Sequence, residues 1–282
     1  MSECLVDDGN GNLVPPDPGD VVPINTLPPL HPATEYLLSR NFNLDSLYKQ
    51  LGCSYCITEA PENPAKGIYY KKLPSNFRDT PQGRIIFYAH VNKVQVGWQA
   101  RIIERVSDDA KHYWHPYYNR WVAMERKNEA GKWEAIPEME IRRPNYSLLW
   151  KPSKYKTAFG MARNDVLMGY DAAVDFNKTL NLKAPTVFLA EGPLDAGRIG
   201  PGCLALLGKY LSDKHAELLL RRFKKLVYFA DNDKAGMEAT ARIKSVFSGK
   251  NIKVIFAKVP EPYKDLGEMP NLDAITLAYN YL

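Results

Sequence analysis

The sequence predicts an α/β protein whose C-terminal part is a parallel sheet covered by helices on both faces. Three short apolar runs, at residues 186–190, 226–230 and 253–259, predict strands. Two segments with the spacing of amphipathic helices, 212–223 and 233–249, lie between them. Strands that are apolar along their whole length and alternate with helices are typical of a parallel sheet buried on both sides.

The N-terminal part is predicted to be a mixed α+β subdomain. Residues 33–42 and 44–52 favour two short helices. Residues 84–103 are rich in β-branched and aromatic side chains on either side of a turn at Asn92 and Lys93. This pattern indicates a β-hairpin.

Composition divides the chain into three parts. Residues 1–32 are rich in Pro, Gly, Asp and Asn and lack periodicity, so they predict a flexible acidic leader outside the core. We expect the N-terminal subdomain to cover residues 33–183, with an aromatic insertion near 108–150. The parallel-sheet domain is expected over residues 184–282.

The net charge of +5 is unevenly distributed. Residues 1–39 contain six acidic residues and no Lys or Arg, so residues 40–282 hold all 37 basic residues against 26 acids. A basic surface attracts polyanions, because each Lys or Arg that neutralises a phosphate releases condensed counterions. Nucleic acid is therefore the expected partner, although a solvated surface with excess charge has the same composition.

Cysteine content and hydropathy indicate which compartment the protein occupies and whether it binds zinc. Four cysteines are too few for a disulfide framework, which favours a reducing environment. Cys53 and Cys56 form one CxxC pair, but no second Cys or His pair stands at the spacing of a zinc ribbon, so no structural zinc is expected. No run of about 20 apolar residues is present to cross a bilayer. We expect a soluble, cytoplasmic protein without a membrane partner.

Acidic residues follow each strand of the predicted parallel sheet. Ligands of such sheets bind at the carboxyl ends of the strands, so acids from three strand ends should meet at one rim. Asp231 and Asp233 are two residues apart, which directs their carboxylates to the same side of an extended backbone. The acids in this position are Glu191, Asp195, Asp231, Asp233 and Asp265.

Such a cluster predicts a site for Mg²⁺ or Mn²⁺. Carboxylate oxygens suit these hard cations, and the like charges would repel one another without them. The bound cations could orient a hydroxyl or water and a phosphate for in-line displacement. Each motif alone is equally compatible with a helix cap or a turn. Their order, and their shared position at strand ends, favour the metal site.

Four segments resemble the TOPRIM domain shared by bacterial-type primases, type IA and type II topoisomerases and certain nucleases. They are FLAEGPLDA, ALLG at 205–208, YFADNDKAG and YKDLGEM. The resemblance implies that Glu191 is the glutamate of acid/base chemistry or phosphate positioning. It implies that Asp231 and Asp233 are catalytic and bind metal, and that Asp195 and Asp265 are further metal ligands.

Segments before this domain resemble the catalytic core of DnaG-type DNA primases, and the EGPLDA variant resembles a bacteriophage version. They are HPATEYLLSR at 31–40, RIIFYAHVNKVQVGWQARII, and KPSKYKTAFGMARNDVLMGYDAA. The resemblance implies metal-dependent synthesis, with two ions, of short RNA primers from NTPs on a single-stranded DNA template. For a bacteriophage protein the compartment would be the host cytoplasm.

The same resemblance implies a track of basic residues that holds template or incoming nucleotide. Its members are Arg101, Lys154, Lys156 and Arg163, with Arg84 as a weaker candidate. Each of these side chains is also compatible with a scaffold surface along which its aliphatic part packs.

Departures from the primase pattern leave alternatives open. No zinc ribbon precedes the core, no GxxxxGK[ST] phosphate loop is present, and only 17 residues follow Asp265. A separate helicase or zinc-ribbon protein is therefore an expected partner. A TOPRIM nuclease and a non-catalytic DNA-binding replication accessory are the alternatives, whereas a topoisomerase would need room for a gate domain. The aromatic and basic run 111–121 is compatible with either strand binding or hairpin packing.

Overall fold

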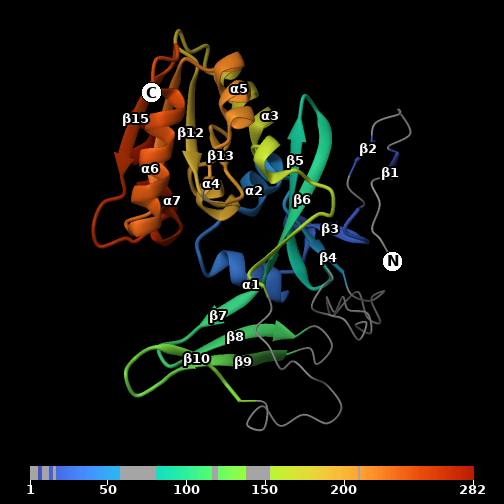
Figure 1. Ribbon diagram of the computed structural model, residues 1–282. Helices are drawn as coiled ribbons and strands as arrows, with labels where there is room; N and C mark the ends of the chain where they lie inside the picture. Colours follow the sequence, from blue (N-terminus) through green and yellow to red (C-terminus); the bar gives the residue numbers. More distant parts are fainter. Residues whose placement is uncertain are drawn as a thin grey trace.

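The fold was analysed in a computed structural model of the chain, which places an α/β domain beside a mixed α+β subdomain (Figure 1). The structure describes residues 6–7, 13–14, 17–57, 81–115, 120–137, 153–208 and 210–282.

The C-terminal domain contains the predicted parallel sheet. Its strand order is β13-β12-β14-β15, and all three pairings are parallel. The strands are β12 (Thr186–Ala190), β13 (Cys203–Ala205), β14 (Lys225–Ala230) and β15 (Lys253–Lys258). The helices are α4 (Pro193–Ile199), α5 (Asp213–Arg222), α6 (Lys234–Phe247) and α7 (Asn271–Tyr279), with the short 3₁₀ helix η7 (Leu266–Glu268). The predicted strands and helices of this domain are confirmed.

The two faces of this sheet enter different cores, because successive side chains of a strand point to opposite sides. Val187 and Tyr228 pack with buried residues of α5 and α6. Phe188 and Phe229 pack with α4 and α7, in a cluster that continues into the N-terminal subdomain. The boundary predicted near residue 183 therefore does not separate two independent cores.

The N-terminal subdomain is built on a five-stranded antiparallel sheet of order β11-β6-β5-β4-β3. The predicted hairpin is confirmed as β5 and β6, with Asn92 and Lys93 both in the left-handed region that a tight hairpin turn requires. The strands are β3 (Val21–Pro23), β4 (Ser54–Cys56), β5 (Arg84–Val91), β6 (Val94–Ile102) and β11 (Tyr155–Thr157). The helical elements are η1 (Ile24–Thr26), α1 (Pro32–Leu38), α2 (Leu44–Leu51), η6 (Arg163–Asp165) and α3 (Tyr170–Thr179).

The aromatic insertion is a separate four-stranded antiparallel sheet of order β10-β9-β8-β7. It lies below the main body and next to α1 in Figure 1. Its strands are β7 (Glu104–Val106), β8 (Ala110–His115), β9 (Arg120–Lys127) and β10 (Trp133–Ala135). We call this sheet the lobe.

The second half of residues 1–32 differs from the flexible leader that the sequence predicted. Two short strands, β1 (Val6–Asp7) and β2 (Leu13–Val14), pair with each other. Strand β3 pairs with β4, and Ile24 is fully buried. The prediction is therefore wrong for residues 21–32, because Val21, Val22, Ile24 and Leu27 supply apolar surface that the Pro-rich composition obscured.

Two further observations concern membrane-spanning helices and the cysteines. Within the described ranges, no helix is long and apolar enough to span a membrane. Cys53 and Cys56 are both buried in the core, where burial raises the pKa of each thiol, that of Cys56 to about 12.

Candidate active site

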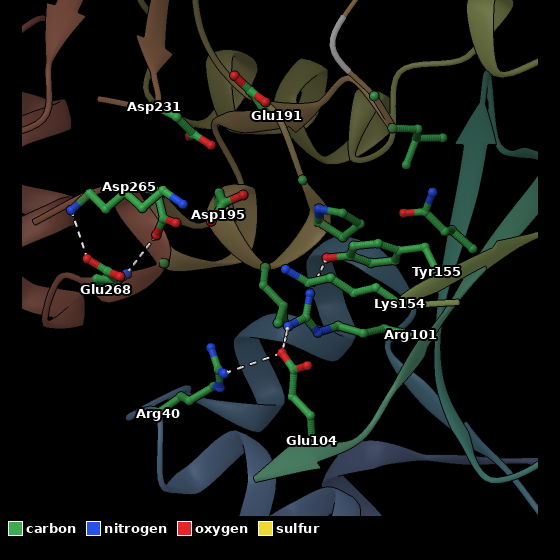
Figure 2. A pocket seen from close by; sticks show the side chains of 18 of the residues that line it. Arg40, Arg101, Glu104, Lys154, Tyr155, Glu191, Asp195, Asp231, Asp265 and Glu268 are labelled. Atoms are coloured by element: carbon green, nitrogen blue, oxygen red, sulfur yellow. Dashed lines mark hydrogen bonds and ion pairs between the residues drawn. The ribbon is translucent and has the colours of Figure 1, made fainter. Parts of the chain in front are cut away.

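A pocket of about 580 Å³ lies where the carboxyl edge of the parallel sheet faces the N-terminal subdomain. Figure 2 shows acidic side chains of the C-terminal domain on one side and basic and tyrosine side chains of the subdomain on the other. The lining side chains that carry charge are Arg40, Arg101, Glu104, Lys154, Arg163, Glu191, Asp195, Asp231, Lys264, Asp265 and Glu268. We call this the acidic pocket.

The first pair of acids comes from the turn between β12 and α4. Glu191 follows the last residue of β12, and its Oε1 accepts a hydrogen bond of 3.4 Å from the Tyr228 hydroxyl. Asp195 lies in the first turn of α4, where a carboxylate is favoured by the helix dipole. A Cβ on Gly192 would lie 2.9 Å from Asp195 Oδ2, so a side chain there would displace the Asp195 carboxylate.

Asp231 follows directly after β14 and lines the acidic pocket. A Cβ on Gly236 would come within 2.1 Å of the Asp231 carbonyl oxygen, so only glycine lets α6 start this close to the strand end. Asp233 is the N-cap of α6, and its Oδ1 accepts a bond of 2.9 Å from the Gly236 amide. Asp233 and Asp231 both line a neighbouring pocket, whereas only Asp231 of the two also lines the acidic pocket.

Asp265 reaches the same pocket through a loop that follows β15. It caps η7, with Oδ1 accepting from the Glu268 amide at 3.0 Å. Asn232 holds this loop, because its Nδ2 donates to the carbonyl oxygens of Val259 and Tyr263. The backbone amide of Asn232 also donates to the carbonyl oxygen of Lys264 at 2.8 Å. The central residue of the D-N-D motif therefore fixes Asp265 beside Asp231.

Crowding of these carboxylates alters their acidity. Burial raises the pKa of Asp231 to about 7, and the negative charges of Glu191, Asp195 and Asp265 add to the effect. Burial and the charge of Asp265 raise the pKa of Asp195 to about 6, against the opposing influence of Arg101 and Lys154. The acids from three strand ends therefore line one pocket and influence one another's acidity.

The donor set suits a hard divalent cation but does not form a closed cage. Among the described residues, no three His, Cys, Asp or Glu side chains lie close enough together to hold an ion by themselves. Mg²⁺ is usually bound by one or two carboxylates, several waters and substrate phosphates. Asp231, Asp265 and Asp195 around one pocket fit that mode of binding, with the substrate completing the coordination.

Arg101 forms the floor of the basic side and is only 4% exposed. Its guanidinium donates to the hydroxyls of Tyr36 and Tyr155 at 2.8 and 2.6 Å and to Glu104 Oε1 at 2.8 Å. These acceptors raise the pKa of Arg101 despite its burial. Arg101 is thus a fixed positive charge beneath Asp195.

The other predicted bases separate into two groups. Lys154 and the exposed Arg163 line the acidic pocket. Lys156 is half-buried on β11 and lies outside its lining. Arg84 is 2% exposed and donates to the Ser153 carbonyl at 2.8 Å. The weaker candidate Arg84 is therefore part of the interior, because its strand β5 lies inside the sheet.

Several lining residues escaped prediction. Arg40 follows α1, and Glu104 begins the lobe; their side chains form an ion pair of 3.8 Å. Tyr155 belonged to a recognised K-Y motif, but no role was assigned to it. Only the spacing of Arg101 and Glu104, opposite charges three residues apart, gave a local signal, since the remaining contacts join distant segments.

Comparison with protein families identifies the C-terminal domain. Residues 188–269 match the family described as Toprim-like. No curated protein gives a significant match to the chain.

Solved structures similar to this chain include DNA primases. A primase domain from Pseudomonas aeruginosa is 16% identical, with a TM-score of 0.52, and the match covers 87% of this chain and 69% of that one. The Aquifex aeolicus primase, with its zinc-binding and RNA polymerase domains, is 18% identical with a TM-score of 0.54, over 88% of this chain and 55% of that one. The RNA polymerase domain of Mycobacterium tuberculosis DnaG, bound to double-stranded DNA with a 6-nucleotide overhang, is 16% identical with a TM-score of 0.52, over 90% and 74% of the two chains.

Proposed function

We propose that this chain, which has the fold of the DnaG-type primase catalytic core and a Toprim-like domain at residues 188–269, synthesises short RNA primers on single-stranded DNA. One observation carries the proposal. Carboxylates from three strand ends and cations of the N-terminal subdomain line the same pocket. A polymerase needs both, because it must bind a triphosphate and activate a hydroxyl beside it.

Asp231 and Asp265 would hold Mg²⁺ or Mn²⁺, with Asp195 as a further ligand. Two ions, when bound, would neutralise the charge that develops on the transferred phosphate and lower the pKa of the attacking hydroxyl. Asp233, two residues after Asp231 and the N-cap of α6, would contribute a further carboxylate to metal binding. Glu191, held by Tyr228, stands beside Asp231 and would accept the hydroxyl proton or position the phosphate.

The basic side would bind the triphosphate and the template. Lys154 and Arg163 line the pocket opposite the carboxylates and are placed to contact phosphate oxygens. Lys156, on the same strand as Tyr155, would extend the track outside the pocket. Arg101, whose side chain is engaged by three acceptors, would set the local potential and position Lys154 and Tyr155 without donating to substrate.

This proposal assigns residues 33–183 to nucleic-acid binding and 184–282 to catalysis. The chain spans 55% of the Aquifex primase, whose structure includes a zinc-binding domain. A separate helicase or zinc-ribbon protein is a further proposed partner, in the cytoplasm of a cell or of a phage-infected host.

The test is synthesis from purified components. The chain is incubated with a single-stranded DNA template, labelled NTPs and Mg²⁺ or Mn²⁺, and the expected products are short oligoribonucleotides. Asp231→Asn should reduce synthesis at least ~100-fold, the scale for loss of one transition-state electrostatic contact. Lys154→Ala combined with Arg163→Ala should also reduce synthesis, whereas Lys183→Ala, an exposed lysine outside the pocket, should not.

A nuclease with the same acids would behave differently in this assay. It would degrade the template in a metal-dependent way, and the double Lys154/Arg163 variant would leave cleavage largely intact. Degradation without any oligoribonucleotide product would overturn the primase proposal. A chain inactive in both reactions that still binds DNA would be the non-catalytic accessory.

A further inference from the structure

We infer that a groove between α1 and the lobe binds the single-stranded DNA template as it passes out of the acidic pocket. This inference rests on the proposed function, because it concerns the strand on which primers would be made. It assigns a role to the lobe, which the proposed chemistry does not use.

The groove adjoins the acidic pocket. It has a volume of about 680 Å³ and runs between α1 and strands β7 and β9. Arg40 and Glu104 line both cavities, and Figure 2 shows them at the end of the acidic pocket away from Glu191 and Asp231. A strand held at the acids would pass Arg40 and Glu104 to reach the groove.

The lining combines an aromatic ring with cations, which is the chemistry that binds single strands without regard to sequence. Trp121 is half-buried and lines the groove, and its ring is fixed edge-on by Trp114 at a centroid distance of 5.7 Å. Arg105 is exposed and lines the groove, and no described residue forms an ion pair with it. A base could stack on Trp121 while the adjoining phosphate meets Arg105.

The charged groups that line the groove are two arginines and two glutamates, so its attraction for a phosphate depends on which of them are already paired. Glu104 is already paired with Arg101 at 2.8 Å and faces Arg40 at 3.8 Å. The remaining charged groups of the lining are Arg105, with which no residue in the described ranges forms an ion pair, and Glu35, an exposed acid in the first turn of α1. Glu35 should therefore weaken strand binding, and its neutralisation should strengthen it.

The experiment measures the affinity of the full chain for labelled oligodeoxythymidylate by fluorescence anisotropy, without NTPs or metal. Arg105→Ala should weaken binding several-fold and lower the slope of log affinity against log salt by about 0.7, the value for one phosphate contact to a single strand. Trp121→Ala should weaken binding by roughly 5- to 100-fold, as expected for loss of one stacked base. Trp121→Phe should restore most of that loss, which distinguishes stacking from collapse of the lobe.

Two further variants sharpen the test. Glu35→Gln should tighten binding, because it removes a repulsive charge. Lys132→Ala removes one positive charge from the exposed turn between β9 and β10, outside the groove, and should change affinity less than twofold.

Equal affinity of the wild type, Arg105→Ala and Trp121→Ala for oligodeoxythymidylate would overturn the assignment of the groove as a strand-binding site, whatever the synthesis assay shows. Tighter binding of an oligoribonucleotide than of the DNA through the same residues would overturn the template assignment. Absence of primer synthesis, together with the predicted losses of affinity, would instead overturn the proposed function and leave the strand-binding groove in place.

Discussion

At the scale of single residues, Arg101 shows how the basic side of the acidic pocket is fixed. Its three nitrogens each reach an acceptor, and its guanidinium lies 5.1 Å from the centre of the Tyr155 ring. The side chains of Arg101 and Glu104 are only 5% and 12% exposed. Removal of one partner of such a pair leaves the other charge buried, which costs more than the pair itself contributes.

We therefore predict that Arg101→Met lowers the free energy of unfolding by about 3 kcal/mol. Arg101→Met combined with Glu104→Gln should recover part of that loss, since no buried charge is then left. Urea denaturation followed by fluorescence measures both, with Lys183→Ala as a control expected within about 0.5 kcal/mol of wild type. A single variant that unfolds at the wild-type urea concentration would show that the network is not structural.

At the scale of elements, α1 depends on a histidine cap. His31 Nδ1 accepts a hydrogen bond of 3.1 Å from the Ala33 amide, and its ring packs edge-on against Tyr55 at 4.5 Å. Burial lowers the pKa of His31 from 6.5 to about 4. Between these two values the unfolded chain binds a proton that the folded chain does not, so stability falls as the pH decreases through this window.

This cap predicts a pH-dependent stability. One pKa unit corresponds to about 1.36 kcal/mol, so His31 should cost the folded state up to roughly 3 kcal/mol between pH 6.5 and pH 4. His31→Asn keeps a capping acceptor and removes the titration. Its free energy of unfolding should therefore decline less over this range than that of the wild type. An equal decline in the free energy of unfolding of the two proteins between pH 6.5 and pH 4 would refute the role of His31.

Local sequence patterns predicted the elements that form the acidic pocket better than the contacts within it. Strand ends followed by acids identify Glu191, Asp195, Asp231 and Asp265, because each signal lies within a few residues. Asp233 has an extended backbone and caps α6 through its Oδ1, the alternative that the sequence left open for a motif of this kind. Tyr36 of α1 and Arg40, which follows it, could not be found this way, since they contact Arg101 and Glu104 from a segment about 65 residues earlier in the chain.

At the scale of the whole molecule, the N-terminal subdomain and one face of the parallel sheet share a core. Phe188 and Phe229 belong to the same buried cluster as Leu37, Tyr55 and Trp98. Arg198, 2% exposed, also ties α4 to the Arg40 carbonyl and to Asn271 of α7. The acidic pocket is lined by both of the parts that share this core. The shared core therefore holds the acidic side and the basic side of the pocket next to each other.

We predict that the two parts unfold together. All five tryptophans lie between residues 98 and 150, so tryptophan fluorescence reports the N-terminal subdomain and the lobe. Far-UV circular dichroism reports largely on helices, of which α4 to α7 belong to the C-terminal domain. The two signals should give one coincident thermal transition. Separate transitions would mean that the shared core does not couple the parts.

The central claim is that carboxylates from three strand ends act as one site for divalent cations, and Mn²⁺ binding followed by electron paramagnetic resonance tests it most directly. The wild type should bind Mn²⁺, and Asp231→Asn and Asp265→Asn should each weaken binding at least ~10-fold, because each removes a charged ligand. Glu238→Gln, which neutralises an exposed acid on α6 outside the acidic pocket, should bind as the wild type does. Identical Mn²⁺ binding by all four proteins would contradict the account.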